Sequence, residues 1–258
     1  MDLYSFLPDG YDKMPTLEHF KVDKYMNYTD CAFLVIPGGG YTHFGDHEGY
    51  GYAKMFNSWG AEAFVLKYSL HPTHFPAQLN DARRAVQYIR KHAEEYGINP
   101  NKIVVVGSSA GGHLAAMLST YKEEVPHVTD ELSEVDFLPN YQVLCYPVID
   151  LADDVITHKG SADALLGENH DIELAKALSP NLIADESAPP AFIFHNADDA
   201  GVSVYNSINY AKKLISYKIP TELHIFPKGG HGVGIAGNKN CGQWTTLLLN
   251  WLKDMKIF

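Results

Sequence analysis

Ile103-Val104-Val105-Val106-Gly107-Ser108-Ser109-Ala110-Gly111-Gly112-His113-Leu114-Ala115-Ala116 is the stretch that decides the fold. A short β-branched run meets Gly-x-Ser-x-Gly, and a run compatible with a helix follows at once. This order predicts a buried strand, a tight turn that carries a serine, and a helix. The serine backbone is strained in such a turn, and the flanking glycines keep Cβ atoms out of it. Ser109 is therefore the candidate nucleophile, and Ser108 only fills the position before it.

Strands and helices are predicted to alternate along the rest of the chain. A continuous apolar run, typical of a parallel strand covered on both faces, occupies residues 31–36. Further strands are predicted at residues 61–68, 141–146, 190–195 and 222–226. Apolar residues with helical spacing occupy 45–60, 81–96, 172–178, 203–217 and 244–252. Residues 17–25 are a candidate edge strand or hairpin arm, and the aperiodic segments 121–140 and 153–190 are candidate cap or lid insertions. We therefore predict a single domain, residues 1–258, with a doubly wound, mostly parallel α/β sheet.

Composition argues against several classes of protein. The 258 residues include 20 Lys and Arg against 31 Asp and Glu, a net charge of −11 that repels nucleic acids and anionic lipid surfaces. No apolar run approaches the roughly 20 residues of a membrane span, and the N-terminus lacks the features of a secretory signal. Cys31 and Cys145 lie in or beside apolar runs and are expected to be core thiols. We expect a cytoplasmic protein with no nucleic-acid or membrane partner.

No metal or other cofactor is expected. His43 and His47 are four residues apart, but the chain has no His-Glu-x-x-His motif. The three cysteines include no Cys-x-x-Cys pair of the kind that binds zinc. The glycine-rich segments lack the Gly-Lys-Ser/Thr of a phosphate-binding loop and the spacing of a dinucleotide fingerprint.

A serine nucleophile needs a base, and the base needs a third group to orient it. An acid pair, Asp198-Asp199, follows one predicted strand, and His231 follows the next in a Gly-Gly-His-Gly turn. The chain order serine, acid, histidine predicts a catalytic triad of Ser109, Asp199 and His231. Asp199 is favoured because it comes four residues after the strand-end His195, and Asp198 remains the alternative acid.

Attack on an acyl carbon also requires N–H donors for the developing oxyanion. Gly39 and Gly40 follow the first apolar run and are predicted to supply two of them, with Ala110 as a third. His113 is expected to support the site by packing or hydrogen bonding. For Tyr41 and Tyr68, stacking on a sugar and a place in the core are both left open.

Several motifs resemble those of the acetyl esterase/lipase-like carbohydrate esterases, which are related to the hormone-sensitive-lipase branch. They are Pro37-Gly38-Gly39-Gly40-Tyr41, residues 107–113, Tyr146-Pro147-Val148-Ile149, Ser179-Pro180, residues 195–199 and residues 226–232. The resemblance implies the α/β-hydrolase fold and the removal of acetyl or feruloyl-type groups from saccharides. The chain departs from the hormone-sensitive-lipase branch at Pro37, where that branch has His, and in the acid loop, which lacks a proline common in relatives.

The resulting hypothesis is a serine esterase that hydrolyses short-chain, acetyl-type esters of sugars or oligosaccharides through an acyl-enzyme. Its partner is then a small-molecule acyl ester, in particular an acylated saccharide. A carboxylesterase, arylformamidase-like or peptidase-like hydrolase of a non-sugar substrate is the alternative, and a non-catalytic binding protein with the same fold is a further one. The oligomeric state, a homodimer included, is left open.

Overall fold

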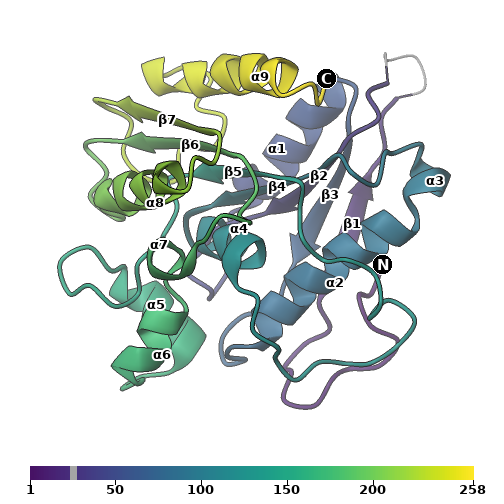
Figure 1. The fold of residues 1–258 in the computed structure, drawn as a ribbon, viewed down its shortest axis with the longest axis horizontal. Coiled ribbons are helices and arrows are strands. Elements are labelled where there is room, and N and C mark those ends of the chain that lie inside the picture. The colour runs from purple at the N-terminus through teal and green to yellow at the C-terminus, as the bar shows by residue number, and fades with distance from the viewer. Residues whose placement is uncertain (24–27) are drawn as a thin grey trace.

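Seven strands form one sheet in the computed structural model, which describes residues 1–23 and 28–258 (Figure 1). In spatial order they are β1 (Thr16–Phe20), β3 (Glu62–Lys67), β2 (Ala32–Ile36), β4 (Ile103–Ser108), β5 (Tyr141–Cys145), β6 (Ala191–Asn196) and β7 (Thr221–Phe226). β1 pairs antiparallel with β3, and every other neighbouring pair is parallel. The sheet is therefore mostly parallel, as the apolar runs predict.

Helices cover both faces of the sheet (Figure 1). They are α1 (Asp46–Ser58), α2 (Ala77–Lys91), α3 (Ala93–Tyr96), α4 (Ser109–Thr120), α5 (Lys159–Leu166), α6 (Ile172–Ala177), α7 (Pro180–Ile183), α8 (Tyr205–Ser216) and α9 (Trp244–Asp254), with a 3₁₀ turn at Asn240–Gln243. In the described part of the chain, none of them combines the length and the apolar character needed to cross a membrane. The arrangement is the doubly wound α/β fold that the sequence predicts.

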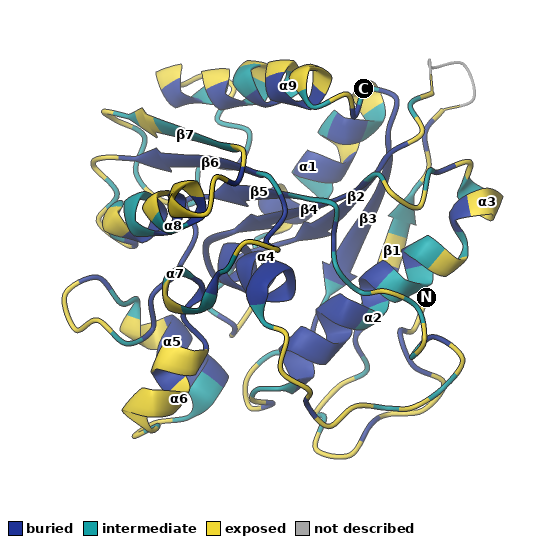
Figure 2. Ribbon diagram, in the orientation of Figure 1, coloured by how far each residue is buried: buried dark blue, intermediate teal, exposed yellow. Residues whose placement is uncertain are grey.

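The central strand β4 shows why a strand inside the sheet is apolar on both faces. Successive side chains of a strand point to opposite faces of the sheet. Ile103 and Val105 join the cluster under α2, α4 and α8, whereas Val104 and Val106 join the cluster under α1 and α9. All four side chains are fully buried, and Figure 2 shows β4 and the adjoining α4 buried along their length. A strand covered on both faces favours apolar residues at successive positions, because each polar group that it buries needs a hydrogen-bond partner.

Two local expectations differ from the structure, and one is confirmed. The helix predicted over 81–96 begins earlier, at Ala77, and is divided at His92 into α2 and α3. The candidate edge strand is β1, which ends at Phe20, and residues 24–25 of that prediction lie outside the described residues. Cys31 and Cys145 are buried free thiols, as expected, and Cys241 is a third.

The two predicted insertions occupy different places. Residues 121–140 run along α2, where Arg83 donates to the carbonyl of Tyr121 and Arg90 donates to that of Leu138. Residues 153–190 carry α5, α6 and α7. Of the two, only the second contributes residues to the pocket around Ser109.

Phe33→Ala tests how far stability depends on the covered faces of the sheet. The Phe33 ring is fully buried and stacks on Phe56 of α1 with a centroid distance of 3.8 Å. Truncation leaves a cavity that costs about 3–5 kcal/mol of unfolding free energy. Phe6 is 57% exposed, and Phe6→Ala is expected to change stability by less than about 0.5 kcal/mol. Denaturant titration of both variants measures the difference, and equal effects would contradict the expectation.

Candidate active site

Ser109 lies at the turn between β4 and α4, at the carboxyl edge of the sheet. Its φ angle is +52°, in the left-handed region that side chains rarely adopt. The turn closes because the neighbouring backbones approach without side chains: a Cβ at Gly107 would lie 2.2 Å from the Gly111 carbonyl oxygen. A Cβ at Gly111 would lie 2.2 Å from the carbonyl oxygen of Ile36 in β2. The strain and the glycines thus stand where the motif predicts them.

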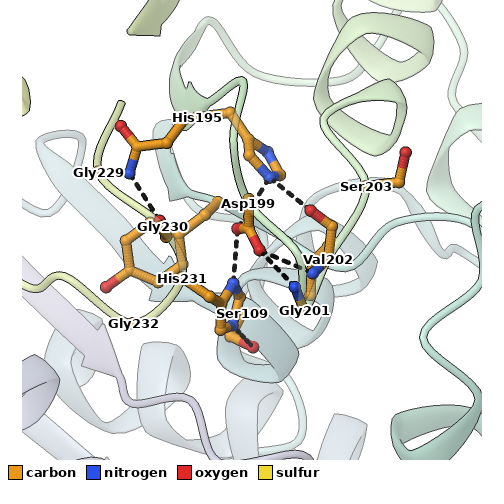
Figure 3. A network of polar contacts seen from close by, with 12 residues as sticks. Ser109, His195, Asp199, Gly201, Val202, Ser203, Gly229, Gly230, His231 and Gly232 are labelled. Carbon is orange, nitrogen blue, oxygen red and sulfur yellow. Dashed lines mark hydrogen bonds and ion pairs between the residues drawn. The ribbon is translucent and has the colours of Figure 1, made fainter. Parts of the chain in front are cut away.

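A line of hydrogen bonds joins Ser109, His231 and Asp199 (Figure 3). The His231 Nε2 atom lies 2.8 Å from the Ser109 Oγ, and its Nδ1 atom lies 2.7 Å from the Asp199 Oδ2. An ionised carboxylate only accepts hydrogen bonds, so Nδ1 carries the proton. Nε2 is then the acceptor for the serine hydroxyl. The loops after β4, β6 and β7 therefore bring together the three residues that the chain order singles out.

The Asp199 carboxylate is fully buried and held by several donors (Figure 3). Its Oδ1 accepts from the backbone N–H groups of Gly201 and Val202, each at 2.9 Å. His195 Nε2 lies 3.2 Å from Oδ2 and 3.0 Å from the Val202 carbonyl oxygen, which it donates to. Burial by itself raises the pKa of Asp199, but the hydrogen bonds from His195, His231 and Val202 hold that pKa below its ordinary value. The carboxylate therefore stays ionised and fixed against His231.

Asp198, the alternative acid, has a different set of partners. Its Oδ1 accepts from the backbone N–H groups of Gly229 and Gly230, each at 2.9 Å. It thus anchors the loop that carries His231 and makes no hydrogen bond to the ring itself. Of the two adjacent acids, Asp199 is hydrogen-bonded to the imidazole and Asp198 to the loop backbone.

Gly39 and Gly40 lie beside Ser109 in the loop after β2, and all three line one pocket. Both glycines have positive φ angles, +130° and +61°. Their N–H groups make no backbone hydrogen bond to the described residues, and that of Ala110 lies in the first turn of α4, where N–H groups lack helical partners. The three predicted oxyanion donors therefore stand around Ser109, and their role in catalysis stays a prediction.

Glu48 is a buried residue of the site that no sequence motif marks. It belongs to α1, is 4% exposed, and its Oε2 accepts from the Gly38 N–H at 2.9 Å. Its Oε1 accepts from the Tyr146 hydroxyl at 2.7 Å, and that hydroxyl accepts from the Gly234 N–H at 2.9 Å. One carboxylate thus ties the glycine loop after β2 to the loop that carries His231. Acidic residues are common in the first turn of a helix, where they interact favourably with the helix dipole, so Glu48 gives no sign of a role in the site. Its one signal in the sequence is its position shortly after the glycine loop.

Ser108 and His113 support this framework, as expected. The Ser108 hydroxyl donates to Tyr52 at 3.1 Å. His113 donates from Nε2 to the Leu178 carbonyl at 2.8 Å, so its Nδ1 accepts from the Tyr41 hydroxyl at 2.7 Å. Burial lowers the pKa of His113 to about 4, which keeps the ring neutral above that pH.

The two tyrosines left open by the sequence belong to the core. Tyr41 is fully buried and Tyr68 is 2% exposed, so neither ring is available for stacking on a ligand. The Tyr68 hydroxyl instead donates to the Pro37 carbonyl at 2.9 Å, which fixes the start of the glycine loop.

A pocket of about 380 Å³ opens over Ser109. The described residues that line it are Gly39, Gly40, Thr42, His43, Gly45, His47, Glu48, Ser109, His158, Gly160, His231 and Gly232. His47 donates from Nε2 to the Gly232 carbonyl at 2.9 Å, and it thereby helps to hold the His231 loop. Within residues 1–23 and 28–258, no three His, Cys, Asp or Glu side chains are grouped so as to hold a metal ion.

Comparisons with known proteins identify relatives over most of the chain. The family model BD-FAE matches residues 24–214. The chain is 36% identical over 221 residues to the endo-1,4-β-xylanase B of Butyrivibrio fibrisolvens, covering 84% of this chain and 34% of that protein. It is 33% identical over 235 residues to an acetylxylan esterase of Xylanibacter ruminicola, covering 89% of this chain and 46% of the relative. The chain thus spans between a third and a half of the length of these curated relatives.

A solved structure matches over nearly its full length. The acetyl ester-xyloside bifunctional hydrolase of Caldicellulosiruptor lactoaceticus superposes with a TM-score of 0.92 at 37% identity. The match covers 100% of this chain and 96% of that one. The α/β-hydrolase fold expected from the motifs is therefore confirmed.

Glu48→Gln tests the buried link between the two loops. An amide nitrogen in place of one carboxylate oxygen faces a donor, either the Gly38 N–H or the Tyr146 hydroxyl, so one hydrogen bond is lost or rearranged. We expect a loss of about 1–3 kcal/mol in unfolding free energy. Glu94→Gln, on an exposed position of α3, is the matched control and is expected to change stability by less than about 0.5 kcal/mol. Denaturant titration that finds the two variants alike would refute the structural role of Glu48.

Proposed function

Because this chain belongs to the BD-FAE family of α/β hydrolases, we propose that it is a serine esterase that removes acetyl-type groups from saccharides. The observation that carries the proposal is the hydrogen-bonded line Ser109–His231–Asp199, which opens on a pocket walled by glycine and polar side chains. The catalytic assignments of these residues are part of the proposal.

The mechanism follows from the protonation states that the hydrogen bonds impose. Asp199 keeps the proton on Nδ1 of His231, so Nε2 takes the Ser109 proton as the Oγ attacks the acyl carbon. The N–H groups of Gly39, Gly40 and Ala110 bind the oxyanion that forms. His231 then gives its proton to the departing alcohol oxygen, and an acyl-enzyme remains. Water, deprotonated by His231, attacks the acyl carbon, and His231 returns that proton to the Ser109 Oγ as the acyl–oxygen bond breaks and the acid leaves.

The pocket supports a short acyl group and a hydroxyl-rich alcohol. The described residues of its wall include no leucine, isoleucine, valine or phenylalanine, which a long acyl chain would require for burial. His158 adds a donor: its Nδ1 accepts from the Ser161 backbone N–H at 3.2 Å, so the neutral ring carries its proton on Nε2. A sugar hydroxyl is a suitable acceptor for that proton. Burial lowers the pKa of His158, which favours this neutral form.

The relatives support the same substrate class. The full-length structural match is named an acetyl ester-xyloside hydrolase, and one curated relative is named an acetylxylan esterase. Because the pocket suits this substrate class, we propose an acetyl ester of a saccharide as the substrate of this chain as well.

Ser109→Ala tests the nucleophile. The variant lacks the attacking oxygen, and we expect kcat for 4-nitrophenyl acetate and for acetylated xylose to fall by about 10³-fold or more. Ser108→Ala is the matched control, because the Ser108 hydroxyl bonds Tyr52 and does not touch the pocket. Acetate release and nitrophenol absorbance measure the two reactions. A Ser109→Ala enzyme as active as the wild type would disprove the serine mechanism.

The variants Asp199→Asn and Asp198→Asn distinguish the roles of the two adjacent acids. Without the Asp199 carboxylate, the tautomer of His231 is no longer fixed, and we expect kcat to fall by about 10⁴-fold. Asp198→Asn loosens only the loop anchor, so we expect a decrease of about tenfold or less. The same esterase assays rank the two variants, and the reverse order would transfer the role of triad acid to Asp198.

A further inference from the structure

We propose that a second cavity beside the Ser109 pocket binds a neighbouring sugar unit of the saccharide that carries the scissile ester. The inference rests on the proposed function and extends it from single sugars to oligosaccharides. This cavity has a volume of about 300 Å³, against about 380 Å³ for the Ser109 pocket. The exposed residue Thr42 lines both, so the two spaces adjoin at this residue.

The second cavity lies at the same edge of the sheet as Ser109. Its floor comes from the residues that end and follow β3, Lys67 to His71, and one wall comes from Phe44 in the loop after β2. Strands β2 and β3 are neighbours and run parallel, so their carboxyl ends lie side by side (Figure 1). The segment 12–15, just before β1, forms the opposite wall, because β1 runs antiparallel and begins at this edge. Ligands of open α/β sheets bind at this edge of the strands.

The lining combines an aromatic ring with charged groups. Phe44 is partly buried, and the Lys67 ammonium lies 4.8 Å from its ring centroid while bonding the Asp46 carboxylate at 3.2 Å. The Asp12 side chain is exposed and forms no hydrogen bond or ion pair with the described residues. The cavity thus offers an ammonium donor and an unengaged carboxylate acceptor next to an apolar surface.

A sugar unit matches this combination better than an acyl chain. A pyranose presents hydroxyl groups that both donate and accept, together with C–H groups that pack on apolar surface. An acyl chain would bury only apolar surface and would cover the Asp12 carboxylate without offering it a hydrogen-bond donor. A volume of about 300 Å³ lies at the lower end of the range for small-molecule sites, which suits one monosaccharide unit. A saccharide that crosses Thr42 would occupy both spaces at once.

The test is a chain-length series of O-acetylated xylose, xylobiose and xylotriose, with 4-nitrophenyl acetate as a reference that ends at the first pocket. For the wild type we expect kcat/KM to rise by about tenfold once the chain is long enough to reach the second cavity, chiefly through a lower KM. Asp12→Ala removes the acceptor, and Met14→Trp fills the cavity from its wall. Each variant is expected to lose most of that gain, measured as the ratio of kcat/KM for xylotriose to that for the reference ester.

Asp9→Ala is the matched control, an exposed acid of the same N-terminal segment that does not line the cavity, and it is expected to retain the gain. Thermal unfolding shows whether Met14→Trp is folded, and Asp12→Ala changes only an exposed side chain. A gain that persists in both cavity variants overturns the inference, as does a wild type that hydrolyses acetylated xylose equally well at every chain length.

Two other outcomes are distinguishable. If the cavity variants impair 4-nitrophenyl butyrate as strongly as xylotriose, the cavity holds the acyl group and the sugar assignment is overturned. If 4-nitrophenyl acetate is cleaved but no acetylated saccharide is, the proposed substrate class fails, and the inference fails with it.

Discussion

Close backbone contact at the turn after β4 is the constraint on which the site depends. Strand β2, strand β4 and helix α4 meet there with no side chain between them. A Cβ at Gly107 or Gly111 would lie 2.2 Å from a carbonyl oxygen of the neighbouring backbone. The contact places Ser109 directly beside the glycine loop that follows β2. It also forces the positive φ of +52° at Ser109, a strain that the buried strands and helix on either side hold in place.

Two buried carboxylates organise the loops around that turn. Asp199 is held by backbone N–H groups and two histidines, and Glu48 is held by a backbone N–H and a tyrosine hydroxyl. A buried charge is costly unless its oxygens are hydrogen-bonded, so each carboxylate fixes the geometry of whatever donates to it. Asp199 thereby orients His231, and Glu48 holds Gly38 and, through Tyr146, the segment after His231. The site is built on loops, and these two acids fix the positions of those loops relative to one another.

Much of the fold and the chemistry was predictable because its signals are local. Apolar runs predict covered strands wherever both faces are packed, and the glycine spacing around Ser109 predicts a turn that only glycines permit. The residues missed act at long range. In the sequence Glu48 looks like an exposed helical acid, and only the fold brings the distant Tyr146 into contact with it. His158 lines the pocket from an insertion whose path no periodicity in the sequence predicts. The break between α2 and α3 at His92 has no signal in the sequence, because the apolar spacing continues through it.

The sequence by itself determined the order of the elements, the strained turn at Ser109, and the candidates for nucleophile, base and acid, because each depends on residue types at short spacing. It left Asp198 and Asp199 as rivals, and it left Tyr41 and Tyr68 between a sugar site and the core. Only the tertiary structure places the Asp199 carboxylate against the His231 ring, Asp198 on the loop backbone, and the two tyrosines in the core. Hydrogen-bond direction and burial depend on what neighbouring strands bring within about 3 Å, and that proximity arises only when the parallel strands set their carboxyl ends along one edge of the sheet.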